Sequence, residues 1–264
     1  MLLPFTKAHG TGNHFILIYL PDIPNFNLTK ELITKLCDVN IGVGADGLLA
    51  ISNHTKYDYK MDYYNNDGTW ETMCANGARC AGLFLYERKI ISKEATFITG
   101  DGVHDIKIIN EEDIALTIFS PKYVSNEIHV ENLSGFSVNS GAKHFIVEIP
   151  QKQELNWGNI GEKIRYSKQF PNGTNVNFVK YIDKNNLEVI TYEKGVEKIM
   201  QSCGSGSVAA AYHMQRKYNL SLELIIHVKG GKLYVHADKE WKKVWLKGPA
   251  KLLFNAKIET TDYE

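Results

Sequence analysis

Two cysteines stand at matching places in two similar stretches of the chain. Cys74 lies in ETMCANGARC and Cys203 in QSCGSGSVAAAYH, and small residues and a helix-like run follow each of them at once. A cysteine at the start of a helix lies at the positive end of the helix dipole, which favours its thiolate. Two thiols placed in this way could serve one substrate, one as the base and the other as the acid.

The same helix starts could also hold a carboxylate. The backbone N–H groups of a first helical turn point out of the helix end and form an anion site. Here they belong to Ala75 and Asn76 in the first stretch and to Gly204 and Ser205 in the second. If both starts bind one carboxylate, its α-carbon lies between two sulfurs, and the amides stabilise the enediolate formed on deprotonation. The pattern predicts inversion of a stereocentre without a cofactor or a metal.

A packing role is the alternative for any single cysteine, because free cysteines are among the most buried residues. The matched pair favours function, whereas Cys37 and Cys80 lack such surroundings and are expected to pack. Four cysteines without a C-x-x-C pair form neither a disulfide framework nor a zinc site, so we expect reduced thiols. The missing C-x-x-C also disfavours a thiol oxidoreductase, and a non-catalytic binding module stays open.

Charge and hydropathy limit the class of partner. Thirty basic and thirty acidic residues cancel in a chain of 264, and no long basic run occurs. The chain therefore lacks the charge pattern of a nucleic-acid binder or a polybasic membrane binder. No signal peptide and no apolar stretch of membrane-spanning length is visible. We expect a cytoplasmic protein that acts on a small molecule.

Most of the chain has the pattern of short strands separated by turns. Predicted strands cover residues 15–20, 59–64, 95–100, 105–109, 114–119, 144–149, 175–182, 187–193, 224–230, 232–237 and 243–248. Helices are predicted over 28–38, with Thr29 as N-cap, over 161–169, and after each of the two cysteines. The many small residues in the last two predict helices that are enclosed by sheet.

The two halves repeat one order of strands, a turn, an acidic residue, a thiol and a helix, which predicts a duplicated domain. We expect one domain over residues 1–119, with a C-terminal tail 253–264 that returns to it, and a second domain over 120–252. The fold class is α/β (α+β), with two pseudo-symmetric domains, each a sheet wrapped around a central helix.

A set of motifs resembles the pyridoxal-phosphate-independent diaminopimelate epimerases. The motifs are KAHGTGNHF, GVGADGLL, YNNDGTWETMCANGARC, GTNVNFV, YEKG, CGSGS and PAKLLF, in this order. The resemblance implies barrel-like antiparallel sheets around the two helices, an active site between the domains, an amino-acid substrate and a homodimer. It also implies epimerisation of LL-2,6-diaminopimelate to the meso form, in the synthesis of lysine and of peptidoglycan precursors.

The resemblance also implies roles for single residues. Cys74 and Cys203 would be the acid/base pair, with His144 and Glu193 as auxiliary groups near the thiols and the α-amino group. The substrate-binding residues would be Asn13, Asn65, Asn175 and Lys194, together with the amides of Ala75, Asn76, Gly204 and Ser205.

Several positions depart from the family pattern. His14 replaces an acid, Ala142 replaces an asparagine, and Lys194 replaces an arginine that could grip a carboxylate at two points. Lys143 could supply the missing donor, and Glu197 could compete with Glu193, because the stretch before Cys203 is one residue longer. Since the departures concern the far end of the substrate, a racemase of a different amino acid and a non-catalytic amino-acid-binding homologue are the alternatives.

Overall fold

The structure is a computed structural model that describes residues 2–150 and 155–260. Its helices are α1 (Lys30–Cys37), α2 (Ala75–Glu87), α3 (Trp157–Arg165) and α4 (Gly204–Tyr218), with a 3-10 turn η1 (Leu20–Asp22). The strands in the first part of the chain are β1 (Leu2–Gly10), β2 (Asn13–Tyr19), β3 (Gly47–Ser52), β4 (Tyr59–Asn65), β5 (Trp70–Glu71), β6 (Glu94–Thr99), β7 (Gly102–Ile108) and β8 (Ile114–Ile118). Those that follow are β9 (Lys122–Val130), β10 (Leu133–Asn139), β11 (Lys143–Glu148), β12 (Asn175–Tyr181), β13 (Asn186–Glu193), β14 (Lys198–Ile199), β15 (Glu223–Val228), β16 (Gly231–Ala237), β17 (Val244–Gly248) and β18 (Lys251–Glu259).

The chain divides into two compact units. Unit 1 holds the residues up to Leu116 and those from Gly248 onward, and unit 2 holds Thr117–Lys247. The chain therefore enters unit 2 within β8 and leaves it within β17. β18 then pairs antiparallel with β1, from Lys251 opposite His9 to Glu259 opposite Leu2. Residues 261–264 of the predicted tail lie outside the described residues.

Both units have the same strand order. In unit 1 the order is β18, β1, β2, β3, β4, β6, β7, with β2–β3 and β4–β6 parallel and the other pairs antiparallel. In unit 2 it is β9, β10, β11, β12, β13, β15, β16, with β11–β12 and β13–β15 parallel. Each parallel pair is joined through one of the four helices, as a parallel connection requires. The predicted fold class is confirmed, and the sheets are mixed rather than purely antiparallel.

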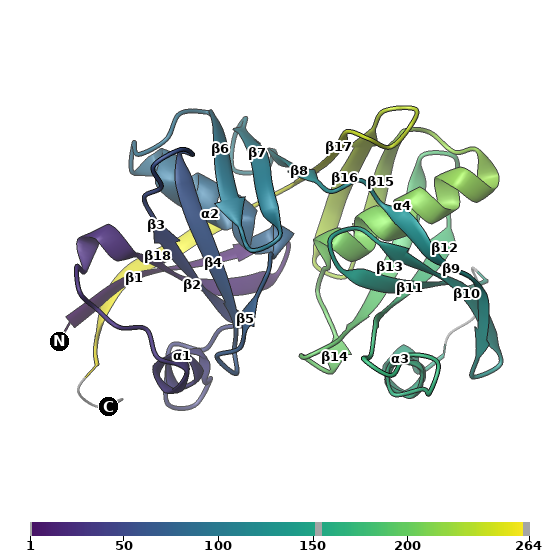
Figure 1. The fold of residues 1–264 in the computed structure, drawn as a ribbon, viewed down its shortest axis with the longest axis horizontal. Helices are drawn as coiled ribbons and strands as arrows, with labels where there is room; N and C mark the ends of the chain where they lie inside the picture. Colours follow the sequence, from purple (N-terminus) through teal and green to yellow (C-terminus); the bar gives the residue numbers. More distant parts are fainter. Residues whose placement is uncertain (1, 151–154, 261–264) are drawn as a thin grey trace. The chain divides into compact units, whose positions relative to one another are not determined.

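Each unit encloses one helix that is buried on nearly all sides (Figure 1). α2 packs against β1, β2, β3, β4, β7 and β18, and α4 packs against β10, β11, β12, β13, β15 and β16. Residues 75–85 of α2 are all buried, and five of them are glycine or alanine, namely Ala75, Gly77, Ala78, Ala81 and Gly82. A Cβ on Gly82 would overlap the side chain of Ile106, and one on Gly206 would overlap the amide of Asn177. The small residues therefore let strands approach each central helix closely.

The outer helices cover the other face of each sheet. Leu32, Ile33 and Leu36 of α1 pack with β1, β2 and β3 side chains, and Ile164 of α3 packs with β11, β12 and β13 side chains. Thr29 caps α1 as predicted, because its side chain accepts a hydrogen bond from the Leu32 amide. α3 begins at Trp157 and not near residue 161, because the side chain of Asn156 accepts from the Asn159 amide and caps the helix there.

Seven observed strands lie outside the predicted strand ranges, namely β1, β3, β9, β10 and β18 and the two-residue strands β5 and β14. β9 and β18 leave most of their side chains exposed, so they lack the alternation of apolar and polar residues that marks a half-buried strand. Among residues 2–150 and 155–260, no helix has both the length and the apolar character needed to span a bilayer.

Tight packing around α2 predicts that Gly82→Ala destabilises the protein. Alanine favours a helix over glycine by about 1 kcal/mol, but overpacking against the fully buried Ile106 costs about 1–3 kcal/mol. The matched control is Gly158→Ala in α3, where the new Cβ meets no atom closer than 3.4 Å. Chemical denaturation should show a lower free energy of unfolding for Gly82→Ala and an equal or higher one for Gly158→Ala. Equal stabilisation by both changes would contradict the enclosed packing of α2.

Candidate active site

The two cysteines occupy equivalent positions at the starts of the two enclosed helices. Cys74 is the N-cap of α2 with φ −129° and ψ 114°, and Cys203 is the N-cap of α4 with φ −131° and ψ 115°. The first intrahelical bonds run from the Ala78 amide to Cys74 O and from the Ser207 amide to Cys203 O. In each unit the N–H groups that come before Ala78 or Ser207 therefore point out of the helix end, beside a partly exposed thiol.

In unit 1 the Cys74 sulfur lies among side-chain amides. Its Sγ is 3.7 Å from Asn13 Oδ1, and that oxygen also accepts a hydrogen bond of 3.3 Å from Asn76 Nδ2. Asn13 Nδ2 donates in turn to Asp46 Oδ2 at 2.8 Å, which fixes the orientation of the Asn13 amide. Because Asn13 presents its oxygen to the sulfur, it can accept a hydrogen bond from the Cys74 thiol.

Lys7, His14 and Asp46 form a cluster behind Asn13. Lys7 Nζ lies 3.1 Å from His14 Nδ1, and His14 Nε2 lies 3.6 Å from Asp46 Oδ2. Lys7 also donates to the carbonyl of Gly44, and burial lowers the pKa of its ammonium group. His14 thus stands between a cation and an anion, at the place where the family pattern has an acid.

Asn65 lies at the same end of the unit 1 sheet as Asn13. It ends β4 opposite Gly47 of β3, and Gly47 is in turn in register with Phe15, two residues after Asn13. Its side chain accepts from the Tyr63 hydroxyl at 2.8 Å and donates to Thr69 Oγ1 at 3.2 Å. Unit 1 therefore gathers Asn13, Asn65 and the start of α2 at one end of its sheet.

In unit 2 a chain of hydrogen bonds leads from the sheet to Cys203. Asn177 Nδ2 donates to Thr191 Oγ1 at 2.7 Å, and Asn177 Oδ1 lies 2.9 Å from His144 Nδ1. His144 Nε2 lies 2.9 Å from Ser205 Oγ, which is 3.7 Å from the Cys203 sulfur. This series of hydrogen bonds places His144, a predicted site residue, one hydroxyl group away from the Cys203 thiol.

Burial determines the protonation state of His144 and, through it, the direction of these hydrogen bonds. His144 is fully buried, and burial lowers the pKa of its imidazole to about 4, with the Asn177 hydrogen bond opposing the shift. At neutral pH the ring therefore carries one proton, and the acceptor Asn177 Oδ1 holds it on Nδ1. Nε2 then accepts from the Ser205 hydroxyl, and the Ser205 oxygen is left to accept from the Cys203 thiol.

Asn175 connects two lysines at the same sheet end as His144. Asn175 of β12 is in register with His144 of β11. Asn175 Nδ2 donates to the carbonyl of Lys143 at 3.2 Å, and its Oδ1 accepts from the amide of Lys194 at 2.9 Å. Glu193, the last residue of β13, is partly exposed and pairs with Lys198 across the turn. Unit 2 thus gathers His144, Asn175, Glu193 and the start of α4.

Glu197 lies in the turn that lengthens the stretch before Cys203. Its φ of 55° and the bond from its amide to Glu193 O accommodate the extra residue. Its Oε1 accepts from Arg165 Nη2 at 3.1 Å and from the Gly195 amide at 3.0 Å. Because these donors already bind the carboxylate, Glu197 is a weaker candidate than Glu193 for a role at the thiols.

Three further polar residues support the site without having been predicted. Asp46 holds Asn13, Asn177 holds His144, and Arg79 binds Asn76 Oδ1 at 2.8 Å. The sequence contains one signal for Arg79, since it is a charged residue in an otherwise small and apolar helix. Nothing in the spacing of Asp46 or Asn177 reveals which amide or ring each one contacts.

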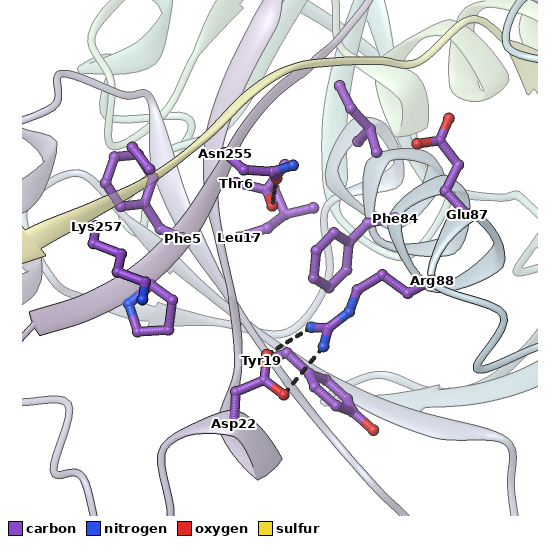
Figure 2. Close-up of a pocket in the computed structure, with 13 residues that line it drawn as sticks. Phe5, Thr6, Leu17, Tyr19, Asp22, Phe84, Glu87, Arg88, Asn255 and Lys257 are labelled. Carbon is purple, nitrogen blue, oxygen red and sulfur yellow. Dashed lines mark hydrogen bonds and ion pairs between the residues drawn. The ribbon is translucent and has the colours of Figure 1, made fainter.

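Unit 1 also has a cavity of about 530 Å³ that contains none of the predicted site residues (Figure 2). Arg88 lines one side of it, makes two bonds to Asp22, of 2.8 and 3.1 Å, and lies over the rings of Tyr19 and Phe84. This arrangement ties the end of α2 to η1. In the described part of the chain, no group of three or more His, Cys, Asp or Glu side chains is placed to hold a metal ion.

Several solved structures have the same fold as this chain. The chain superimposes on a probable proline racemase from Agrobacterium radiobacter with a TM-score of 0.74 at 12% identity, covering 97% of this chain and 93% of the other. A hydroxyproline epimerase from Agrobacterium vitis gives 0.73 at 12% identity, covering 97% and 91%. A phenazine biosynthesis protein of the PhzF family from Bacillus anthracis gives 0.72 at 17% identity, covering 98% and 99%. These likenesses define the class of fold.

Sequence comparison identifies the family within this class. The model of the diaminopimelate epimerase family matches residues 5–115 and 136–253. The diaminopimelate epimerase of Flavobacterium psychrophilum is 38% identical over 96% of this chain and 98% of its own length. That of Aquifex aeolicus is 30% identical over 97% and 98%. The chain belongs to the diaminopimelate epimerase family.

The low pKa of His144 predicts a loss of stability in mild acid. The unfolded chain takes up a proton near the ordinary pKa of about 6.5, whereas the folded protein does so only near pH 4. The unfolded state therefore binds more protons between these values, and the free energy of unfolding falls by up to about 3 kcal/mol as the pH drops through this window.

Denaturation at several pH values measures this loss. In His144→Gln, which keeps a donor and an acceptor but cannot titrate, the fall between about pH 6.5 and 4 should be smaller than in the wild type. The same pH dependence in both proteins would show that His144 is not the buried neutral group described above.

Proposed function

We propose that the chain epimerises LL-2,6-diaminopimelate to meso-diaminopimelate with Cys74 and Cys203 as its acid/base pair and without a cofactor. Family membership makes the chain an isomerase, and its substrate class is an amino acid. The observation that carries the mechanism is the pair of equivalent N-caps, each with a thiol beside the outward-pointing amides of an enclosed helix. Inversion of a carbon needs a base on one face and an acid on the other, and two thiols meet that need.

The proton transfer proceeds in two steps. One cysteine, as a thiolate, removes the α-proton, and the electron pair of the C–H bond moves into the carboxylate to form an enediolate. The other cysteine, as a thiol, then delivers its proton to the opposite face of the same carbon. Helix-start amides at Ala75, Asn76, Gly204 and Ser205 stabilise the charge that develops on the oxygens. The roles of the two sulfurs exchange when the reaction runs in reverse.

The neighbouring polar groups orient the thiols and the substrate. His144 acts through Ser205, whose oxygen it turns toward Cys203. Asn13 acts on Cys74 directly, because its oxygen lies within hydrogen-bond reach of the sulfur. Asn65 and Asn175 lie at the same sheet ends as the thiols and bind the amino or distal groups of the substrate, and Glu193 takes the α-ammonium group.

The distal carboxylate of diaminopimelate is bound by lysines in this chain. The Asn175 side chain holds the backbones of both Lys143 and Lys194, so the two side chains leave the fold next to one amide. The ammonium group of Lys194 takes the place of the family's arginine. The ammonium group of Lys143 takes the place of the asparagine side chain expected at position 142, where this chain has Ala142. Because an ammonium group is a less directional partner than a guanidinium, racemisation of another acidic amino acid is the second candidate function.

The biological setting that fits this activity is the synthesis of lysine and of peptidoglycan precursors. Both thiols must stay reduced to exchange protons, and a disulfide between them would abolish the reaction. We place the enzyme in the cytoplasm for this reason, since that compartment keeps thiols reduced.

Replacement of either thiol should abolish epimerisation. With LL-diaminopimelate as substrate and no pyridoxal phosphate, Cys74→Ala and Cys203→Ala should each lower kcat by at least about 10²–10⁴-fold, because one face of the carbon loses its proton carrier. Cys37→Ala is the control. It removes a buried thiol whose pKa burial raises to about 12, and it should leave kcat unchanged. Full activity in either active-site variant would refute the two-thiol mechanism.

A substrate panel separates the two candidate functions. LL-diaminopimelate, glutamate, aspartate and lysine are incubated with the protein, and each product is resolved by chiral chromatography. Diaminopimelate should have the highest kcat/KM, and Lys194→Met should raise its KM more than it lowers kcat, since Lys194 binds the distal group only. Faster turnover of another amino acid would assign the second function, and no turnover of any amino acid would favour a binding protein.

We further infer a homodimer that forms along β18. Within the described residues this nine-residue strand pairs with β1 alone, and it leaves Leu253 and Phe254 about half exposed, at 46% and 51%. An edge strand with exposed apolar side chains is a ready partner for a second copy. Light scattering should give the dimer mass for the wild type and a monomer for Phe254→Lys. A monomeric wild type at micromolar concentration would exclude this assembly.

A further inference from the structure

Arg79 is a guanidinium buried completely within the first turns of α2. Its Nη2 donates to Thr11 Oγ1 at 2.9 Å and to Asn76 Oδ1 at 2.8 Å. Its Nη1 donates to Ala75 O at 3.2 Å, and its Nε donates to Pro249 O at 3.3 Å. All four acceptors are uncharged oxygens, so the hydrogen bonds engage each of the three nitrogens but leave the positive charge uncompensated.

A buried charge ordinarily needs an opposite charge nearby, because its removal from water is costly. Across residues 2–150 and 155–260, no aspartate or glutamate forms an ion pair with Arg79. Burial lowers the pKa of the guanidinium to about 10, so it keeps its proton at neutral pH. The ionisable groups that interact with it are two cysteines, Cys80 and Cys74.

Only one of these two cysteines is a suitable anion. Cys80 is fully buried, and burial raises the pKa of its thiol to about 12, so it stays protonated. Cys74 is partly exposed at the helix start. Arg79 also reaches Cys74 through polar side chains, because the Arg79 bond to Asn76 Oδ1 turns Asn76 Nδ2 toward Asn13 Oδ1, which lies 3.7 Å from the sulfur.

Other titratable groups lie on the elements packed against α2, and they do not replace Arg79. Near the start of the helix, the charges of Lys7 and Asp46 oppose each other across His14. Burial lowers the pKa of His9 on β1 and raises that of Tyr59 on β4, so both are neutral at about pH 7. His104 of β7 lies 3.0 Å from Asp101, and Lys60 lies 2.7 Å from Asp62 on β4. Further charged groups stand on exposed positions of β7 and β18, among them Asp105, Lys107, Lys251, Lys257 and Glu259. Arg79 is thus the uncompensated charge behind Cys74.

At the position equivalent to Arg79, unit 2 has an uncharged residue. The two helix starts align residue for residue, from Cys74 with Cys203 to Arg79 with Val208. Val208 is also fully buried, so an isopropyl group stands where unit 1 has a guanidinium. The imidazole nearest Cys203 in the hydrogen-bond series, His144, is uncharged at neutral pH and is linked through Ser205 Oγ to the sulfur.

We propose that Arg79 is a positioning residue that stabilises the thiolate of Cys74, so that the substrate-free protein holds Cys74 as the base and Cys203 as the acid. The guanidinium charge adds to the helix dipole at Cys74 and is balanced by the sulfur anion. At Cys203 the position that corresponds to Arg79 is Val208, so the helix start carries no guanidinium there. This inference rests on the proposed function only in naming the two sulfurs as base and acid.

Alkylation of each thiol as a function of pH tests the proposal without substrate. The full-length protein is treated with iodoacetamide, and the rate at each cysteine is measured by peptide mass spectrometry. The pH midpoint of Cys74 should lie at least about one unit below that of Cys203. Arg79→Met, which keeps the volume and removes the charge, should raise the Cys74 midpoint by about one unit or more and leave Cys203 unchanged. Arg79→Lys should restore most of the shift.

Three controls keep the result interpretable. Cys80 and Cys37 should stay unreactive in every folded variant, so their alkylation reports unfolding in the same sample. Thr11→Val removes one acceptor of Arg79 but no charge, and should move the Cys74 midpoint by less than half as much as Arg79→Met. An equal shift in Thr11→Val would assign Arg79 a purely structural role.

The wild type alone can also overturn the proposal, even if Arg79→Met fails to fold. Equal midpoints for Cys74 and Cys203, or a lower one for Cys203, would do so. Failure of the proposed function has a different signature, because active Cys74→Ala and Cys203→Ala variants would refute the epimerase mechanism while the alkylation midpoints could still differ as stated.

Discussion

The placement of a cysteine at the N-cap of an enclosed helix is the constraint on which the other features of each unit depend. The cap position turns the thiol toward the outward-pointing amides, so one helix start provides both a proton carrier and an anion site. Sheet packing around α2 and α4 prevents either helix from shifting, and only small residues allow strands to come that close. The repeated strand order therefore serves mainly to hold two helix starts in the same local geometry.

The two cysteines have nearly the same backbone geometry but different polar neighbours. The two N-caps agree within a few degrees in φ and ψ, yet Cys74 faces a side-chain amide backed by a buried cation, and Cys203 faces a hydroxyl backed by a neutral imidazole. Duplication explains the shared scaffold, and divergence of buried residues explains the difference. An acid/base pair benefits from such inequality, because one member has to begin as an anion and the other as a proton donor.

The sequence reveals the features that depend on local chemistry. Thr29 capping α1, the helices after both cysteines and most alternating strands follow from short-range patterns. The early start of α3 depends on one asparagine cap, which competes with the weaker helical pattern after it. β18 was missed because an exposed edge strand has no buried face to impose alternation. Contacts such as Asp46 with Asn13, or Asn177 with His144, join residues over 30 positions apart and have no local signal.

The fate of the α-proton tests most directly whether two thiols serve one carbon. Protium-labelled LL-diaminopimelate is mixed with excess enzyme in D2O, and the reaction is quenched within a single turnover. If two thiols act on opposite faces, the meso product carries solvent deuterium at the inverted carbon while the remaining LL isomer keeps its protium. Product that retains the original protium at that carbon would mean that one group carries the proton between faces, and would contradict the two-thiol mechanism.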